Sequence, residues 1–315
     1  MAVQEEQRHS EALPVICLAG PTGSGKTAAA LLLARELDCE VINADSRQVY
    51  ADFPCITAQP SAEEQAVCPH HLYGFLPTQQ KISAGYWVAA ATECVRAVLA
   101  RGRIPLLVGG TGLYFQALLH GIAQIPRLDP AIGRGIENRL AKQGASALYD
   151  ELARYDPSYA ARIHPNDRQR IVRALEVLEG TGRTFSWWHA NSMAPPLCQG
   201  PLLTLAAPLA WLEPRLAARL DMMLAQGALD EARQALQNCA DAKAPGWSGI
   251  GAAEALAYLR GLLNIETCCR LWLQNTRAYA KRQLTWFRAR KEAVFLPPDD
   301  PTIILEQARL FLDTV

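Results

Sequence analysis

One octapeptide near the amino end constrains the fold of this chain more than any other feature. Residues 20–27 read GPTGSGKT and satisfy the pattern G-x-x-x-x-G-K-[ST]. The apolar residues 15–19 precede the pattern, and residues 28–37, which are rich in helix formers, follow it. In the order strand, glycine loop, helix, the loop amides and the helix N-terminus can face a polyanion. We therefore predict a phosphate- or pyrophosphate-binding loop.

Each residue type in this loop has a physical reason to be there. The glycines let successive backbone N–H groups turn inward, Lys26 adds a mobile charge, and the Thr27 hydroxyl can bind Mg²⁺. The predicted diphosphate-binding residues are Gly20, Pro21, Thr22, Gly23, Ser24, Gly25, Lys26 and Thr27. The loop alone does not specify which phosphate compound it holds.

Strands alternate with helices through the first part of the chain. Residues 41–44 and 104–108 are apolar strand candidates, and residues 84–100 and 112–120 have helical patterns. This alternation predicts an α/β fold: a parallel sheet of the P-loop NTPase type with helices on both faces.

The pattern changes near residue 125. Residues 130–143, 145–155, 157–163 and 167–179 are helical windows without a strand between them. Residues 202–206 then predict a returning strand, residues 214–224 and 229–236 predict helices, and the last third is predicted to be helical through residue 291. We therefore expect a first core segment at 1–124, an all-helical insertion at 125–200, and core completion with a basic helical region at 201–315.

Three polar positions outside the loop are candidates for chemistry. Asp45 ends a predicted strand, and ligands of parallel sheets lie beyond the carboxyl ends of the strands. Asp45 can bind Mg²⁺, accept a proton, or simply stabilise a turn. Thr111 follows another strand, where it can contact a substrate or form an ordinary turn. Arg215 and Arg219 share a helix face that is either solvated or places one guanidinium on a phosphate leaving group.

Basic residues cluster locally, although the 31 Lys and Arg balance the 31 Asp and Glu. Between 270 and 291 the chain carries seven basic residues and no acidic one, interleaved with Trp272, Tyr279, Trp286 and Phe287. A second cluster spans 162–173. Either cluster alone is typical of a solvated helix face with core aromatics, but two clusters around a phosphate loop predict a polyanionic partner such as RNA.

The remaining composition indicates a cytoplasmic globular protein. The nine cysteines are irregularly spaced without a CxxC pair, and Cys68-Pro69-His70-His71 lacks a second ligand pair, so we expect no structural metal. The first fourteen residues lack the pattern of a secretory signal. The longest apolar stretch, residues 202–212, is too short to span a bilayer, so we expect no membrane association.

Seven segments match one known family in its own order. They are GPTGSGKT (20–27), INADSRQVY (42–50), TAQPSAEE (57–64), PHH (69–71), GRIPLLVGGTGLYFQALLHG (102–121), RIHPNDRQRIVRALEV (162–177) and TRAYAKRQLTWFR (276–288). Over nearly its full length the chain resembles the bacterial tRNA dimethylallyltransferase family. The helical insertion is similar to the family's tRNA-clasping subdomain.

The resemblance implies prenyl transfer from dimethylallyl diphosphate to the exocyclic amine of the adenosine just 3′ of the anticodon. It implies that the loop holds the diphosphate leaving group with Mg²⁺, that Asp45 is the base, and that Thr111 contacts the adenine. Helix register and the family motif favour Arg219 over Arg215 as the catalytic arginine. We expect a monomer whose partner is the tRNA anticodon stem-loop.

The resemblance also assigns three segments to tRNA contact, and the basic cluster near the carboxyl end adds further candidates. The predicted contacts are Asp45, Ser46, Arg47, Gln48, Gln169, Arg170, Ile171, Val172, Arg173, Trp247, Ser248, Gly249, Ile250, Gly251, Ala252, Lys281, Arg282 and Arg288. The chain departs from the family pattern at Ile56, Gln59, Gly133 and Ala252.

Two other functions are compatible with the phosphate loop. In a small-molecule or nucleoside kinase the loop holds ATP and Asp45 deprotonates an acceptor hydroxyl. In an RNA-binding regulator the loop acts only as a switch and Asp45 is dispensable. The basic and aromatic carboxyl-terminal region favours the transferase, because a small acceptor does not require it.

Overall fold

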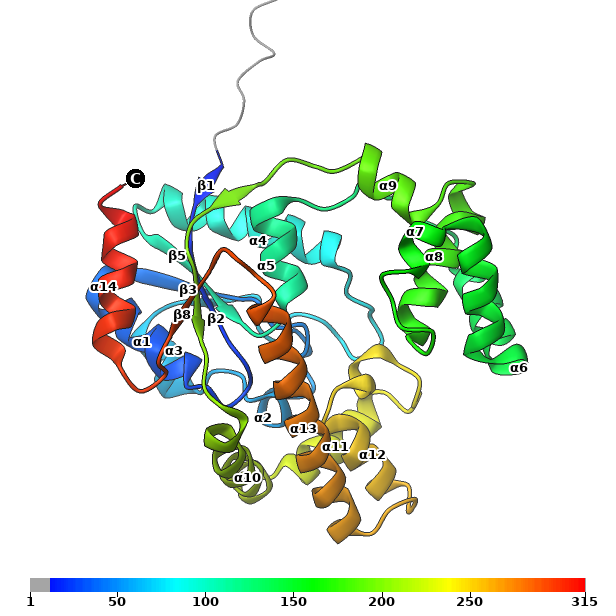
Figure 1. Cartoon of the computed structure of the whole chain (residues 1–315). Helices are drawn as coiled ribbons and strands as arrows, with labels where there is room; N and C mark the ends of the chain where they lie inside the picture. Colours follow the sequence, from blue (N-terminus) through cyan, green and yellow to red (C-terminus); the bar gives the residue numbers. More distant parts are fainter. Residues whose placement is uncertain (1–11, 315) are drawn as a thin grey trace, which may run out of the picture. The chain divides into compact units, whose positions relative to one another are not determined.

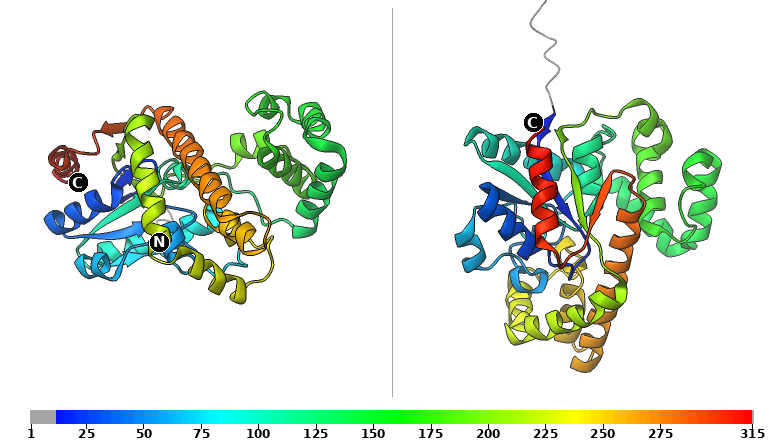
Figure 2. Two further views of the ribbon diagram at one scale, coloured as in Figure 1. Left: turned by 90° about the horizontal axis from the view of Figure 1, so that it is seen from below. Right: turned by 60° about the vertical axis from the view of Figure 1, so that its left-hand side comes forward.

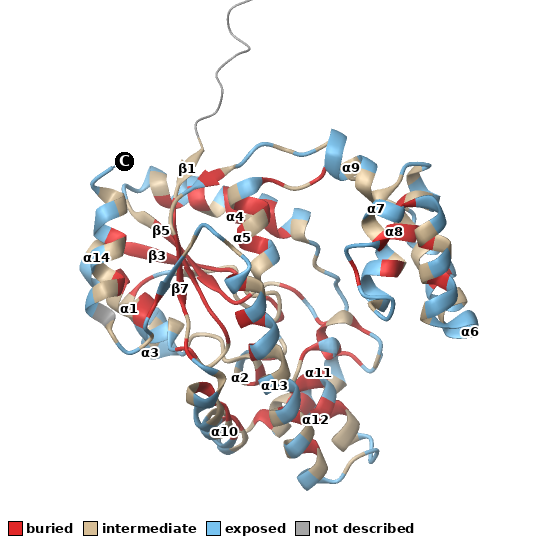
Figure 3. Cartoon of the chain, viewed as in Figure 1, coloured by how far each residue is buried: buried red, intermediate tan, exposed pale blue. Residues whose placement is uncertain are grey.

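A six-stranded parallel sheet forms the centre of the molecule. The computed structural model describes residues 12–314 (Figure 1). The strand order is β4 (His70–His71), β3 (Cys39–Asn43), β5 (Ile104–Gly109), β2 (Ile16–Ala19), β7 (Leu202–Leu205) and β8 (Ala293–Leu296), and every neighbouring pair is parallel. The residues of β2, β3 and β7 are all buried, as expected for strands covered on both faces (Figure 3).

Helices cover both faces of this sheet, which confirms the predicted fold class. On one face α1 (Lys26–Leu37) packs beside α14 (Pro301–Leu312), and Leu33 and Ile304 share a core cluster with Leu18 of the sheet. On the other face lie α4 (Ala84–Ala100) and α5 (Gly112–His120) (Figures 1 and 2). The short strands β1 (Leu13–Pro14) and β6 (Cys198–Gln199) form a separate two-stranded parallel sheet.

A helical layer follows the returning strand β7. It consists of α10 (Leu209–Ala225), α11 (Ala228–Asn238), the 3₁₀ helix η1 (Pro245–Ser248), α12 (Ala252–Leu259) and α13 (Ile265–Arg288). The short helices α2 (Pro54–Thr57) and α3 (Ala62–Val67) precede β4. Phe53, Trp247 and Trp272 are buried together in the core between α2 and this layer. This layer carries several of the predicted site residues.

Residues His120–Pro196 form a second compact unit with its own core. Its helices are α6 (Pro130–Tyr155), α7 (Pro157–Ala160), α8 (Arg168–Thr181) and α9 (Phe185–Asn191). Ile136, Leu148 and Leu175 are fully buried in this unit. The unit begins and ends a few residues earlier than the insertion predicted from the sequence at 125–200. The domain bounds predicted from the sequence stay a proposal.

The chain enters and leaves this unit through two adjacent segments. Leu197 N–H donates to Leu118 O at 3.1 Å, and Ala194 N–H donates to Ile122 O at 3.1 Å. Gly121 has φ 83°, and a Cβ there would lie 1.9 Å from Ala194 O, so this close approach requires glycine. The helical unit is thus an insertion whose two ends meet.

In the last third, one predicted helix starts earlier than expected and one strand was not predicted. The helix predicted from Pro214 begins at Leu209 and contains Pro214 within it. It continues through proline because Leu212 and Leu216, on either side, pack into one core cluster. No element was predicted after residue 291, where β8 completes the sheet before α14. A four-residue strand at a sheet edge has too weak a local pattern to stand out.

Candidate active site

The predicted phosphate loop lies between the carboxyl end of β2 and the start of α1. Gly23 and Gly25 adopt φ values of 80° and 86°, which residues other than glycine rarely adopt. A Cβ on Gly20 would lie 2.7 Å from Leu205 O, so the loop also needs glycine for close packing. Helix α1 starts at the N-cap Gly25 without a side-chain cap, which leaves its first backbone amides for another acceptor.

The Ser24 hydroxyl in this loop is fully buried and has no hydrogen-bond partner among the described residues. An unpaired buried hydroxyl is costly unless something completes its bonding. Together with the uncapped helix end, it indicates a loop built around a polar ligand. An anion with several oxygens fits this arrangement.

Lys26 folds back over the loop. Its Nζ donates to Gly20 O at 2.9 Å and to Pro21 O at 2.8 Å, which leaves one N–H free. Burial lowers the pKa of Lys26 to about 8, an effect that the Asp45 charge opposes and the Arg219 charge strengthens. The ammonium therefore gains from an anion close to it.

Asp45 follows the carboxyl end of β3 and is fixed by the buried Asn43. The Asp45 N–H donates to Asn43 Oδ1 at 2.8 Å, and Asn43 Nδ2 donates to Asp45 O at 3.0 Å. Asp45 Oδ1 accepts from the Arg47 N–H at 2.8 Å. Its Oδ2 has no hydrogen bond within the described chain. The carboxylate is thus held in place with one oxygen available.

Thr111 joins the turn after β5 to the segment that carries Asp45. Its Oγ1 accepts from Ser46 N–H at 3.0 Å and donates to Ser46 Oγ at 3.3 Å. Its own N–H donates to Ala44 O at 3.2 Å. Thr111 also forms a side-chain hydrogen bond with Tyr279. The two strand ends and α13 therefore meet at this hydroxyl.

Three tyrosines lie within electrostatic range of the Asp45 carboxylate. Burial, and next the negative charge of Asp45, raises the pKa of Tyr73, Tyr114 and Tyr279 above the usual range. These phenols stay protonated and neutral at physiological pH. Neutral aromatic side chains therefore lie near this carboxylate, which sequence patterns alone did not reveal.

The structure separates the two candidate arginines of α10. Arg219 is largely desolvated: burial lowers its pKa, and the Asp45 charge opposes that shift. Arg219 also acts electrostatically on Lys26. Arg215 instead is exposed and stacks over Trp211 with its Cζ 3.5 Å from the ring centroid. Arg219, not Arg215, therefore lies near the loop and Asp45.

Sequence reasoning missed Gln283, which is buried on the inner face of α13. Its Oε1 accepts from the Thr22 N–H of the loop at 3.0 Å, and its Nε2 donates to Gly110 O at 2.9 Å. Two signals were available: Gln283 lies within the family segment 276–288, and it follows Tyr279 by four residues on the same helix face.

Two of the predicted tRNA-contacting segments lie together. Arg47 Nη1 donates to Ser248 Oγ at 2.9 Å, which joins residues 45–48 to residues 247–252. Within them, the Gln48 amide already donates to Thr57 O and Ala58 O. Trp247 and Ala252 are 2% and 1% exposed, so their side chains belong to the core. Any tRNA contact at those two positions depends on their backbone.

The other predicted tRNA contacts are mostly exposed. On α8, Gln169, Arg170 and Arg173 are exposed and Ile171 is buried in the core of the second unit. On α13, Lys281, Arg282 and Arg288 are exposed opposite the buried Leu284 and Phe287. Trp272 and Phe287 are core residues, as the alternative interpretation of the aromatic residues held.

Metal-ligand chemistry at the site is limited to Thr27 and Asp45. Thr27 is exposed in the first turn of α1. No group of three His, Cys, Asp or Glu side chains that could hold a metal occurs in the region described. His71 instead contacts Glu40 at 2.6 Å, and hydrogen bonds from Arg101 and His71 lower the pKa of Glu40 to about 2 despite burial.

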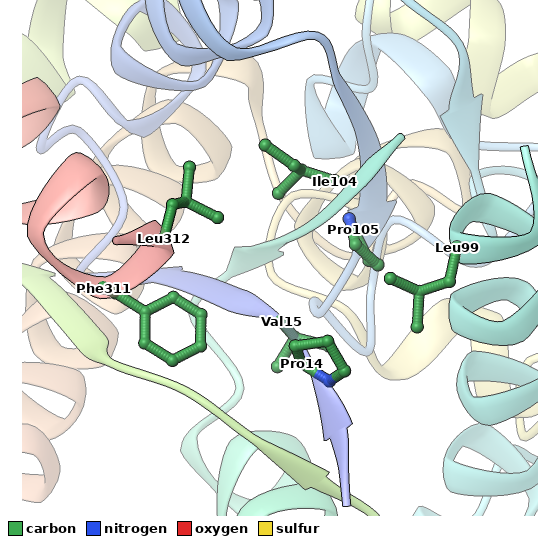
Figure 4. A pocket seen from close by; sticks show the side chains of 7 residues that line it. All are labelled: Pro14, Val15, Leu99, Ile104, Pro105, Phe311 and Leu312. Atoms are coloured by element: carbon green, nitrogen blue, oxygen red, sulfur yellow. The ribbon is translucent and has the colours of Figure 1, made fainter. Parts of the chain in front are cut away.

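A small apolar cavity lies at the opposite edge of the sheet. It measures about 160 Å³ and is lined by Pro14, Val15, Leu99, Ile104, Pro105, Phe311 and Leu312 (Figure 4). Its lining includes the first residues of β5 and those that precede β2, whereas the loop follows the carboxyl end of β2. With no charged group in its lining, it is unsuited to a diphosphate.

Comparison with known proteins shows the family of this chain. The family model described as IPP transferase matches residues 48–290. The chain belongs to the IPP transferase family. It is 70% identical over 299 residues to the tRNA dimethylallyltransferase of Desulfovibrio desulfuricans, covering 95% of this chain and 93% of that protein. It is 40% identical to the tRNA dimethylallyltransferase of Rhodopseudomonas palustris, with 100% and 97% covered.

Solved structures in this family share the fold. The tRNA isopentenylpyrophosphate transferase of Bacillus halodurans is 33% identical, with a TM-score of 0.69 over 94% of this chain and 95% of that one. A eukaryotic dimethylallyltransferase acting on tRNA is 29% identical, with a TM-score of 0.75 over 95% of this chain and 77% of that one. The family resemblance stated from the sequence is thereby confirmed.

No helix among residues 12–314 is long and apolar enough to cross a membrane.

Proposed function

We propose that this chain is a prenyltransferase that moves a dimethylallyl group from dimethylallyl diphosphate to tRNA. The acceptor is the exocyclic amine of the adenosine immediately 3′ of the anticodon, and diphosphate is released. One observation carries the proposal: in a member of the IPP transferase family, the loop, Lys26, Arg219 and Asp45 meet at one edge of the sheet.

The reaction breaks the allylic C–O bond and forms a C–N bond to adenine. Negative charge builds on the leaving diphosphate, which the loop amides, Lys26 and Arg219 can stabilise. The amine loses a proton as the new bond forms, and we propose that Asp45 accepts it through Oδ2, because Oδ1 already accepts from the Arg47 N–H. The Thr111 hydroxyl accepts from the N–H of Ser46, the residue after Asp45. We propose that from this position Thr111 orients the adenine.

Mg²⁺ fits the donor set at the loop. The chain supplies the exposed Thr27 hydroxyl, and Mg²⁺ is commonly held by few protein oxygens together with substrate phosphates and water. When bound, it would neutralise part of the charge on the diphosphate.

We also propose that the protein acts as a cytoplasmic monomer.

The acceptor must reach a carboxylate that lies among buried side chains. We propose that the adenosine leaves the anticodon stack to do so, as bases do in other base-modifying enzymes. The exposed basic residues of α8 and α13 would hold the RNA backbone. The segments 45–48 and 247–252, joined by Arg47 and Ser248, would contact the anticodon loop.

The kinase alternative is not favoured, because the family and the curated relatives are transferases that act on tRNA. A decisive assay incubates the protein with Mg²⁺, unmodified tRNA with adenosine 3′ of the anticodon, and either dimethylallyl diphosphate or ATP. Nucleoside mass spectrometry should show a five-carbon gain on adenosine only with the allylic donor. A matched tRNA with guanosine at that position should show none. No gain on adenosine, with ATP consumed by a small acceptor, would support the kinase instead.

A further inference from the structure

Gln283 connects three parts of the site that are far apart in the sequence. It lies on α13, 261 residues from Thr22, and its side chain is 5% exposed. Its amide oxygen accepts from the backbone of the diphosphate loop, and its amide nitrogen donates to the backbone of the turn that leads to Thr111. Both halves of the amide are therefore used.

The surroundings of this amide exclude most other side chains at position 283. A Cβ on Gly110 would lie 2.0 Å from Gln283 Nε2, so glycine at 110 is what lets the amide reach the backbone. The bridge needs a donor and an acceptor on one uncharged side chain of this length. An apolar replacement would leave the part-buried Thr22 N–H and the buried Gly110 carbonyl without these partners, which costs free energy of folding.

The bridge also fixes the direction of the loop amides. The Thr22 N–H is turned toward Gln283 and the Ser24 N–H donates to Pro21 O at 3.3 Å, so the uncapped first turn of α1 keeps its backbone N–H groups for an anion. The opposite face of α13 carries Lys281 and Arg282, next to Gln283 in the sequence. One helix thus presents a basic surface outward and anchors the loop inward.

We propose that Gln283 is a positioning residue for the diphosphate loop and the Thr111 turn. It does not touch the reacting atoms. It holds the loop in the form that binds the leaving group, and it keeps Thr111 in register with that loop. The inference rests on the proposed function, because it assigns a role within that site.

The first test replaces the amide with an unbranched side chain of similar shape, Gln283→Met, in the full-length protein. Inorganic diphosphate binding is measured by calorimetry with Mg²⁺, tRNA affinity by filter binding, and prenyl transfer at steady state. Gln274→Met, exposed on the same helix, is the matched control. We expect Gln283→Met to raise the diphosphate Kd and the KM for dimethylallyl diphosphate about tenfold to a hundredfold. The tRNA Kd should stay within about twofold.

The second test approaches the bridge from its other end. Gly110→Ala should displace the amide and weaken diphosphate binding to a similar degree. In a Gln283→Ala background there is space for that methyl group, so Gly110→Ala should then add little. Such non-additivity is expected for direct contact.

The outcomes separate the two proposals. Wild-type protein that binds no diphosphate and transfers no prenyl group would contradict the proposed function. Active wild-type protein with an unchanged KM in Gln283→Met would overturn the positioning role alone. A Gln283→Met protein that loses tRNA and diphosphate affinity together would also overturn it, because the residue would then support the fold in general.

Discussion

Asp45 shows how backbone contacts can prepare one side-chain oxygen for chemistry. Asn43 fixes the Asp45 peptide from both sides, and the Arg47 N–H takes up Oδ1. The charge of Asp45 acts on both Lys26 and Arg219, so the carboxylate lies near these two cations. As the proposed base, Asp45 would not depend on side-chain mobility.

The isosteric variant Asp45→Asn should separate catalysis from binding. Its Oδ1 can still accept from Arg47, so the loop should keep its shape, but the amide cannot accept the proton. We expect kcat to fall by about a hundredfold to ten-thousandfold, with the tRNA Kd nearly unchanged. Single-turnover transfer and filter binding measure the two quantities. Turnover near the wild-type rate would remove Asp45 from the role of base.

Lys26 predicts a pH dependence for diphosphate binding. Because burial lowers its pKa to about 8, the free protein loses the ammonium as the pH rises through 8. A diphosphate favours the charged form, so binding above pH 8 must take up a proton. Affinity should be flat below about pH 8 and fall by up to about tenfold per pH unit above it.

Calorimetry between pH 6.5 and 9.5 checks this expectation, with inorganic diphosphate and Mg²⁺. Lys26→Arg is the matched control, because a guanidinium stays charged throughout this range. Its affinity should not fall above pH 8. A parallel fall in Lys26→Arg would assign the titration to another group.

Arg219 and Arg215 offer a comparison within one helix. Arg219→Gln removes a desolvated charge near Lys26 and Asp45, so kcat should fall by about a hundredfold or more. Arg215→Gln removes an exposed guanidinium stacked on Trp211, and kcat should stay within about twofold. Steady-state prenyl transfer decides between them. A larger loss in Arg215→Gln would reverse the assignment.

At the scale of elements, α13 combines two roles on opposite faces. Its inner face packs Leu284 and Phe287 into the fold and carries Gln283, while its outer face exposes Lys281, Arg282 and Arg288. A 24-residue helix with such a division can bind a polyanion without disturbing the core. The outer residues should therefore affect RNA binding and not diphosphate binding.

The double variant Arg282→Gln, Arg288→Gln tests this division. Loss of two phosphate contacts should weaken tRNA binding about tenfold or more and reduce the slope of log K against log salt by about 1 to 2. The KM for dimethylallyl diphosphate should not change. Arg277→Gln is a control on the same helix, because Arg277 is already paired with Glu213 at 2.6 Å. An equal loss of tRNA affinity in that control would argue for a general charge effect.

At the scale of the whole molecule, the chain builds separate cores. Residues His120–Pro196 bury Leu148 and Ile171 among themselves, whereas the loop and Asp45 belong to the other unit. A ligand of the loop stabilises only the folded state that contains the loop. Stability should thus have two parts that respond to different changes.

Scanning calorimetry of the full chain can test this separation. At a diphosphate concentration of 100 Kd, the unit with the loop should gain about 2.7 kcal/mol. Leu148→Ala should instead destabilise the inserted unit by about 2 to 5 kcal/mol and leave diphosphate binding intact. One cooperative transition that both changes shift together would contradict two independent cores.

The sequence by itself determined the phosphate loop, the α/β class, and the position of Asp45 at a strand end. These features depend on contiguous residues: apolar runs set the strands, glycines set the loop, and parallel strands place their carboxyl ends at one edge. The seven ordered segments also identified the family, which the comparisons confirmed.

Only the tertiary structure decided which side chains meet at that edge. It buried Trp247, paired β8 with β7, and joined Gln283 to Thr22 across 261 residues. No local period encodes these results, because each depends on how distant elements pack and on which face of a helix meets the core. Neighbouring residues in the sequence therefore determine the chemistry of the loop. The position of the loop relative to Gln283 and Thr111 depends on contacts that form only when the chain folds.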